Sequence, residues 1–191
     1  MTPQQTFVTS LANPQATRAF GTALAGVLRG GDMVILTGDL GAGKTTLTQG
    51  IGQGLGIRGQ VASPTFIIAR EHPNEGDGPA LVHVDAYRLG SLEEVDALDL
   101  DASLDEAVTV VEWGSGLVEQ LAQDRLEITI SRPRGSLNTS GEFVDLSDAE
   151  SGVRQVTVQA IGLRWANLEL PGLMAQPAPT DDPVEQSEDL S

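Results

Sequence analysis

The sequence predicts an α/β fold in which a central, mostly parallel sheet with added antiparallel strands is flanked by helices. The first observation is a glycine-rich loop, 38–43, that joins a short apolar run, 33–37, to a segment with helical periodicity, 44–55. The second is a run of β-branched apolar residues, 108–111, which is typical of a strand buried on both faces of a parallel sheet. The third is a later stretch, 126–131, that alternates apolar and polar residues, as a strand with one wet face does.

The glycine-rich loop carries a nucleotide-binding motif. Gly-Asp-Leu-Gly-Ala-Gly-Lys-Thr at 38–45 matches the phosphate-binding pattern G-x-x-x-x-G-K-[ST] at every fixed position. Lys44 is the only lysine in the chain, and its compact ammonium fits against β- and γ-phosphates where a planar guanidinium would collide. The Thr45 hydroxyl is placed to coordinate Mg²⁺, and the helix N-terminus adds partial positive charge. We therefore interpret the chain as a P-loop NTPase rather than as a protein with a glycine-rich turn that binds nothing.

The other elements are predicted in chain order from helix caps and strand patterns. Asn13 and Pro14 are typical of a helix N-cap and first position, and the apolar stripe that follows continues to Leu28, before Gly30 and Gly31. The remaining predicted elements are a β-hairpin of strands 66–71 and 81–87, a helix at 91–98, a short helix at 117–122 and a strand at 153–160.

Two carboxylates are candidates for catalysis. Glu112 directly follows the β-branched run, and ligands of open α/β sheets bind at the carboxyl ends of the strands. Glu112 would therefore lie beside the Mg²⁺ held by Thr45, as a metal ligand or as the group that orients attacking water. Asp85 would share a strand face with His83 and Tyr87, which indicates either an active-site wall or a solvent-exposed face.

A further candidate is the segment Ser-Pro-Thr-Phe at 63–66, which lies between the motif helix and the hairpin. Many NTPases keep a loop that senses the γ-phosphate at this place. The hydroxyls of Ser63 and Thr65 would contact phosphate, metal or water there, whereas the segment taken alone would be better interpreted as a proline turn.

The composition limits the function classes. The 191 residues, with 40% hydrophobic content, predict one domain, 1–174, followed by an acidic, proline-rich tail, 175–191, that we expect to be disordered. The absence of cysteine excludes a disulfide framework and cysteine-based zinc sites. A net charge of −16 argues against direct binding of nucleic acid and favours protein partners. No apolar run reaches membrane-spanning length, so we expect a cytoplasmic protein without membrane contact.

Four motifs, in their order and spacing, closely resemble the TsaE family. They are Gly-Asp-Leu-Gly-Ala-Gly-Lys-Thr-Thr at 38–46, Ser-Pro-Thr-Phe at 63–66, His-Val-Asp-Ala-Tyr-Arg-Leu at 83–89 and Val-Glu-Trp at 111–113. The resemblance covers roughly residues 7–135. Members of this family are small bacterial P-loop ATPases required for making threonylcarbamoyladenosine next to the anticodon of tRNA. They work with two partners, TsaB and TsaD.

The resemblance implies a site and its cofactors. By it, the chain binds ATP and Mg²⁺, Thr45 and Glu112 hold the metal, and Asp85 is a catalytic acid near the γ-phosphate together with Glu112. The segment 63–66 is by the same resemblance a switch-like loop, and tRNA is met only through TsaB and TsaD. The nucleotide-binding residues that it implies are Asn13, Gln15, Asp39, Leu40, Gly41, Ala42, Gly43, Lys44, Thr45, Thr46, Ser63, Thr65, Trp113 and Arg134. Relatives carry Asp-Glu ahead of the first helix, where this chain has Asn13 and Pro14.

Three other function classes compete with this interpretation. A regulatory GTPase usually needs an [NT]-K-x-D motif, which a chain with a single lysine cannot supply. A small P-loop kinase that transfers the γ-phosphate to a small molecule would use Thr45 and Glu112 equally well, and Arg132 and Arg134 are a hint of its arginine-rich lid. A nucleotide-dependent interaction protein would use slow hydrolysis as a timer, which overlaps with the role of the family. We expect weak ATPase activity from the isolated chain.

Overall fold

The computed structural model describes residues 2–62, 68–91, 93–94, 105–132 and 152–170, and these residues form seven strands in one sheet. Across the sheet the strands are ordered β1-β7-β6-β2-β5-β4-β3. Their bounds are β1 (Gln4–Leu11), β2 (Met33–Thr37), β3 (Ala69–His72), β4 (Leu81–Asp85), β5 (Val108–Glu112), β6 (Arg125–Ser131) and β7 (Arg154–Ile161).

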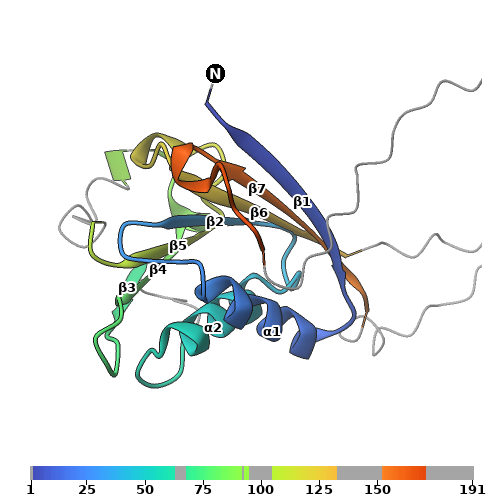
Figure 1. The fold of residues 1–191 in the computed structure, drawn as a ribbon, viewed down its shortest axis with the longest axis horizontal. Coiled ribbons are helices and arrows are strands. Elements are labelled where there is room, and N and C mark those ends of the chain that lie inside the picture. The colour runs from blue at the N-terminus through green and yellow to red at the C-terminus, as the bar shows by residue number, and fades with distance from the viewer. Residues whose placement is uncertain (1, 63–67, 92, 95–104, 133–151, 171–191) are drawn as a thin grey trace, which may run out of the picture.

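The middle of the sheet is parallel and its edges are antiparallel. β2 pairs in parallel with both β5 and β6, and β5 pairs in parallel with β4. At one edge β3 runs antiparallel to β4, and at the other β7 runs antiparallel between β6 and β1 (Figure 1). The predicted α/β fold class, with a parallel centre and added antiparallel strands, is therefore confirmed.

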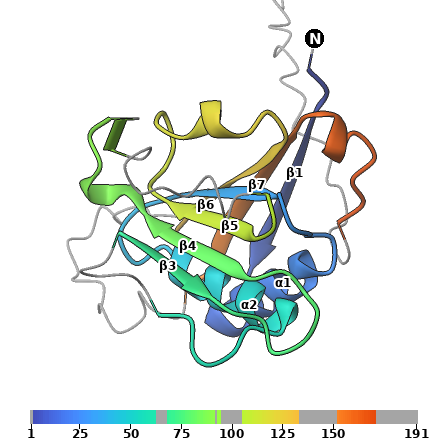
Figure 2. The same ribbon diagram turned by 90° about the vertical axis from the view of Figure 1, so that its left-hand side faces the viewer.

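The two helices, α1 (Pro14–Ala25) and α2 (Lys44–Leu55), lie on the same face of the sheet (Figures 1 and 2). Glycines allow their backbones to touch. A Cβ atom at Gly50 would lie 2.1 Å from the carbonyl oxygen of Arg18, and one at Gly21 would lie 2.4 Å from that of Leu47. Any larger residue at either position would push the helices apart. The close packing fixes α2, whose first residue is Lys44, against α1.

β2 is buried on both of its faces. Val34 and Leu36 belong to the core between the sheet and the helices, whereas Met33 and Ile35 belong to the core on the opposite face. This double burial explains the uninterrupted apolar run that identified the strand in the sequence. It also holds the carboxyl end of β2 firmly between two packed layers, at the point where the phosphate-binding loop begins.

α1 begins as predicted but ends earlier. Asn13 caps its first turn, since the side-chain oxygen accepts a hydrogen bond of 2.8 Å from the backbone N–H of Ala16. The helix ends at Ala25, before Gly26, which has a low helix propensity. Leu28 lies in the turns that follow and is still buried. The apolar stripe therefore predicted burial correctly but not α-helical hydrogen bonding.

The strand predicted at 81–87 also ends early. β4 ends at Asp85 and a single 3-10 turn, η1 (Ala86–Arg88), follows. The turn is capped by Asp85, whose side chain accepts a hydrogen bond of 3.1 Å from the backbone N–H of Tyr87. Tyr87 is consequently an exposed residue of the turn rather than a member of the strand face, and the predicted three-residue polar face is reduced to His83 and Asp85.

The remaining predictions differ in outcome. β5, β6 and β7 confirm the predicted strands within one residue at each end, and β3 pairs with β4 as the predicted hairpin. The helix predicted at 117–122 is only a 3-10 turn, η2 (Glu119–Leu121), and β1 was not predicted. The helix predicted at 91–98 lies mostly outside the described residues, as does the tail at 175–191. In the part of the chain that the structure describes, no helix has both the length and the apolar character needed to cross a membrane.

Candidate nucleotide site

The phosphate-binding loop lies between β2 and α2 and depends on glycine at two positions. Gly38 has a φ angle of 151°, and a Cβ atom there would lie 2.3 Å from the carbonyl oxygen of Ile130. Gly43 is the N-cap of α2 and has a φ angle of 115°, in the left-handed region that disfavours other residues. The loop can therefore pass tightly from the strand into the helix, with the helix N-terminus opening toward the site.

Lys44 reaches back over the loop. Its Nζ donates to the carbonyl oxygens of Gly38 at 2.7 Å and Asp39 at 3.1 Å, and it lies 3.8 Å from the centroid of the Trp113 ring. Burial lowers the pKa of the Lys44 ammonium, while the carboxylates of Glu112, Asp85 and Asp39 act in the opposite direction. An anion bound beside Lys44 would favour its protonated form in the same way.

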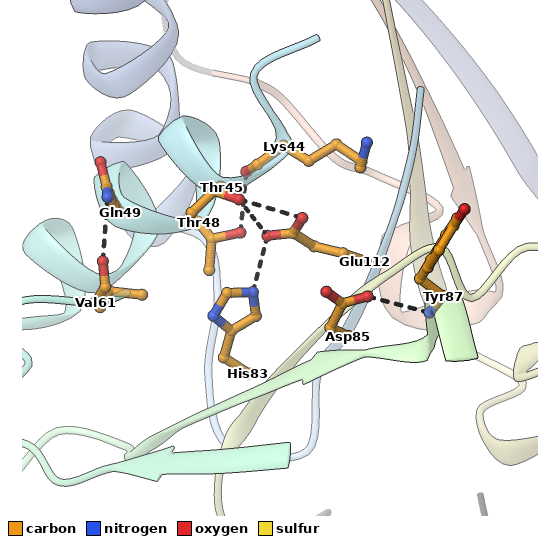
Figure 3. A network of polar contacts seen from close by, with 9 residues as sticks. All are labelled: Lys44, Thr45, Thr48, Gln49, Val61, His83, Asp85, Tyr87 and Glu112. Atoms are coloured by element: carbon orange, nitrogen blue, oxygen red, sulfur yellow. Dashed lines mark hydrogen bonds and ion pairs between the residues drawn. The ribbon is translucent and has the colours of Figure 1, made fainter. Parts of the chain in front are cut away.

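Glu112 is a buried carboxylate at the carboxyl end of β5. The Thr45 hydroxyl donates to it, with distances of 3.0 Å to Oε1 and 3.3 Å to Oε2, and His83 Nε2 lies 2.8 Å from Oε1 (Figure 3). His83 is fully buried, and its contact with Glu112 links β4 to β5 beneath the site. The structure thus brings Glu112 into direct contact with Thr45, and the Mg²⁺ that both were predicted to hold stays a prediction.

Asp85 lies beside Glu112 because the two residues are register partners in the parallel pair β4–β5. It is half-buried, and part of its hydrogen-bonding capacity is used by the cap of η1 (Figure 3). The exposed Tyr87 ring stands edge-on to the Trp113 ring, with 5.3 Å between their centroids. Trp113 directly follows Glu112 and has a φ angle of 63°, which is unusual for a large side chain.

These side chains surround a pocket of about 380 Å³ at the carboxyl edge of the parallel strands. Its lining residues are Pro14, Leu40, Gly41, Gly43, Lys44, Thr45, Thr46, Asp85, Glu112, Trp113, Arg132 and Arg154. Nine of these are among the residues predicted from the sequence. Pro14, Arg132 and Arg154 are not.

Arg132 and Arg154 were missed as site residues, and so was His83. Arg132 Nη2 donates to the carbonyl oxygen of Gly41, and Arg154 Nε donates to that of Ala42 at 3.0 Å. Arg132 directly follows β6, a parallel neighbour of β2, so the shared edge of the two strands was a usable signal. Arg154 begins an antiparallel strand, and nothing in its local sequence indicates the loop.

The other predicted nucleotide-binding residues lie in different surroundings. The side chain of Asn13 caps α1 by accepting a hydrogen bond from the N–H of Ala16. Gln15 is exposed and is not part of the pocket lining. The backbone carbonyl groups of Asp39 and Ala42 accept hydrogen bonds from Lys44 and Arg154, respectively. Ser63, Thr65 and Arg134 lie outside the described residues.

The donor atoms of the site suit a nucleotide with Mg²⁺. A hydroxyl and a carboxylate, Thr45 and Glu112, are oxygen ligands of the kind that Mg²⁺ prefers, and this ion usually keeps several waters and bridges to phosphate oxygens. Among the described residues no group of three or more histidine, aspartate or glutamate side chains could hold a metal alone. The site therefore fits a metal that is shared with a phosphate ligand.

Comparison with known proteins identifies the family of the chain. The family model described as "Threonylcarbamoyl adenosine biosynthesis protein TsaE" matches residues 11–138. The chain is 55% identical over 154 residues to the tRNA threonylcarbamoyladenosine biosynthesis protein TsaE of Streptomyces coelicolor. This alignment covers 80% of this chain and 96% of that protein. It is 40% identical over 157 residues to the protein of the same name from Bacillus subtilis, which covers 82% of this chain and 87% of that protein.

A solved structure is similar as well. The crystal structure of YdiB from Bacillus subtilis superposes with a TM-score of 0.59 at 35% sequence identity, covering 86% of this chain and 90% of that one. The family match extends over the phosphate-binding loop and both carboxylates of the site. The chain belongs to the TsaE family.

Proposed function

We propose that the protein binds ATP with Mg²⁺ in this pocket and hydrolyses ATP slowly, as a factor required for threonylcarbamoyl modification of the adenosine next to the anticodon in tRNA. It would act in the cytoplasm in a complex with TsaB and TsaD. The observation that carries the ATPase part is the direct hydrogen bond between Thr45 and the buried Glu112, beside Lys44. The role in tRNA modification is supported by the names of the relatives to which the chain is similar.

Each side chain of the pocket would have a distinct task. Lys44 and the N–H groups at the start of α2 would neutralise the β- and γ-phosphates. Thr45 and Glu112 would hold Mg²⁺, which supplies charge stabilisation to the phosphoryl group. Asp85, one strand further along, would orient the attacking water, because its carboxylate lines the pocket without contacting Thr45 in the described structure.

His83 would support Glu112 from below. Its Nε2 lies 2.8 Å from Oε1, and the Thr45 hydroxyl lies 3.0 Å from the same oxygen and 3.3 Å from Oε2. A carboxylate held at one oxygen by a buried ring keeps a fixed orientation, and a fixed metal ligand needs no reorganisation when the nucleotide arrives.

Charge supports a role in which tRNA is contacted through the partner proteins. The chain has 27 acidic and 11 basic residues. Of the eleven, Lys44, Arg132 and Arg154 line the pocket and contact the phosphate-binding loop. A surface with this balance repels the phosphate backbone.

The test is a reconstituted modification reaction with purified TsaB, TsaD, unmodified tRNA, a threonylcarbamoyl donor and ATP. Adding the chain should increase the amount of modified tRNA over several turnovers, and the Lys44→Ala variant should not. Filter binding should show weak tRNA binding by the chain alone at moderate salt. Full modification activity without the chain would contradict the proposal. Transfer of the γ-phosphate to a small molecule without the partners would favour the kinase alternative.

A further inference from the structure

Arg154 is a buried cation that β7 delivers to the phosphate-binding loop. It is the first residue of β7, lies outside the residues 11–138 that the family model matches, and is only 3% exposed. Its Nε donates to the carbonyl oxygen of Ala42 at 3.0 Å, and its Nη1 donates to that of Gly152 at 2.8 Å. The guanidinium is thus fixed between its own strand and the loop.

We infer that Arg154 is a positioning residue of the nucleotide site, which holds the Ala42–Gly43 peptide in the orientation that binds phosphate. The inference rests on the proposed nucleotide binding. In a trans peptide the C=O and N–H groups point in opposite directions, and the described residues contain no cis peptide. Because the Ala42 carbonyl is turned toward Arg154, the N–H group of Gly43 is aimed to the other side of that peptide, away from the arginine.

The packing around Gly43 strengthens this assignment. A Cβ atom at Gly43 would lie 3.3 Å from Arg154 Nε and 3.6 Å from its Cδ, so the arginine packs directly against the N-cap of α2. The Cγ2 of Thr17, on α1, would lie 3.7 Å from the same Cβ atom. The N-cap of α2 is therefore packed against a helix, α1, and a strand, β7, that belong to different parts of the sequence.

The position of Arg154 depends on the antiparallel flank of the sheet. Arg154 is the register partner of Leu11, the last residue of β1, and α1 begins three residues after that. β1 and β7 thus bring Arg154 and α1 to the same end of the sheet as the loop. On this view β1 and β7 do more than complete the sheet, because they set the geometry of the phosphate-binding loop.

Electrostatics points the same way. Burial lowers the pKa of the Arg154 guanidinium, and the nearby charge of Arg132 lowers it further. Both arginines line the pocket with Lys44. Cations that lie close to one another in a pocket repel, and an anion such as a triphosphate bound beside them would relieve that repulsion.

The test compares Arg154→Gln and Arg154→Lys with Arg164→Gln. Arg164 is a matched control, since this partly buried arginine also donates to a backbone carbonyl, that of Val27 at 2.7 Å, but lies outside the nucleotide pocket. Arg154→Gln should weaken the calorimetric affinity for ATP and Mg²⁺ by about tenfold or more, as expected for a lost hydrogen bond to a charged group. Arg154→Lys should restore part of that loss, and Arg164→Gln should leave the affinity within about twofold of the parent.

A second measurement follows amide hydrogen exchange in the phosphate-binding loop in the absence of nucleotide. In the ligand-free protein, Arg154→Gln should raise amide hydrogen exchange in peptides that cover residues 38–46, and Arg164→Gln should not. Unchanged exchange in this segment, or parent-like ATP affinity in Arg154→Gln, would overturn the inference. If the parent bound no nucleotide but Arg154→Gln still loosened the loop, the positioning role would stand and the proposed function would fail. Should Arg154→Gln not fold, Arg154→Lys gives the same readouts.

Discussion

Two buried carboxylates at opposite ends of the parallel strands, Glu112 and Asp32, have very different partners. Asp32 precedes β2 and is 5% exposed. It accepts from the backbone N–H of Arg29 at 2.8 Å and from the Arg164 guanidinium at 3.1 and 3.2 Å. Glu112 is 3% exposed and ends β5, and its contacts are the hydroxyl of Thr45 and the ring of His83.

The difference separates a structural carboxylate, Asp32, from the one for which we propose a function, Glu112. The charge of Asp32 is compensated by a guanidinium that is itself held by the Val27 carbonyl and stacked 4.1 Å above the ring of Trp165. Glu112 has a hydroxyl and an imidazole as its contacts and faces a pocket that contains Lys44. A carboxylate in that setting can exchange contacts with a metal or a water, whereas the ion pair of Asp32 can only be broken. The partners, rather than the degree of burial, distinguish the two.

Glu112→Gln should have the largest effect among the substitutions that compare the two carboxylates. With TsaB and TsaD present, ATP hydrolysis should fall by about 100-fold or more, because the amide cannot hold Mg²⁺ or act on water as the carboxylate does. ATP affinity should stay within a few-fold, and the free energy of unfolding should not fall, since a buried charge is removed. Phosphate release measures the rate of ATP hydrolysis, and urea unfolding measures the free energy of unfolding. Hydrolysis at the parent rate would remove Glu112 from the site.

Asp32→Asn should show the opposite pattern. Breaking the ion pair with Arg164 should lower the free energy of unfolding by about 2 kcal/mol, below the usual cost for a fully buried pair because Arg164 is partly exposed. ATP affinity and hydrolysis should remain close to those of the parent. Urea unfolding and calorimetry on the same preparation test this. If Asp32→Asn lost ATP binding but kept the stability of the parent, the structural role assigned to Asp32 would be contradicted.

Asp85→Asn should have a smaller effect on hydrolysis than Glu112→Gln. Asp85 lines the pocket next to Glu112, but one of its oxygens caps η1 and its expected partner is a water rather than the metal. We expect a decrease of about tenfold in hydrolysis with little change in ATP affinity. A decrease as large as that of Glu112→Gln would instead place Asp85 among the metal ligands.

How much of this could be predicted from the sequence depends on the range of the interactions. Glu112 was predicted because parallel strands end at one edge of a sheet, so a residue after such a strand lies near the loop. Asp85 was singled out by the alternation along its strand, and its role was predicted from the resemblance to the TsaE family. β1 was missed because Phe7 and Leu11 are its only large apolar residues besides Val8, and its stability comes from pairing with β7, some 150 residues away. An edge strand of this kind leaves little periodicity to detect.

Arg154 was missed for a related reason. Its distance from the loop is short only because β7 runs antiparallel to β6, which brings the first residue of β7 to the edge where β6 ends. The direction of a strand is a property of the whole sheet and is absent from the local sequence. His83 was noticed as part of a polar strand face, but its role as a partner of Glu112 required the register of β4 and β5.

The smallest effect that we predict is a pH dependence of stability caused by His72, a buried histidine. The pKa of His72, on β3, is lowered by burial and then by the charges of His83 and Arg70, and its Nε2 has no hydrogen-bond partner among the described residues. The unfolded chain therefore binds a proton more readily than the folded one, so stability is full above the ordinary pKa of 6.5 and falls as the pH drops below it. In urea unfolding between pH 7.5 and about pH 5, His72→Gln should flatten this decline relative to the parent. Parallel pH profiles for the two proteins would contradict the assignment.

The most direct test of the site is a calorimetric titration of ATP with Mg²⁺ into the parent protein and into Lys44→Ala, with urea unfolding as a check on the fold. The parent should bind one ATP per chain. Lys44→Ala should bind about 100-fold more weakly or not measurably, because the planar guanidinium groups of Arg132 and Arg154 do not fit against the β- and γ-phosphates as a compact ammonium does. Unchanged ATP affinity in a folded Lys44→Ala protein would contradict the assignment of this pocket as the nucleotide site.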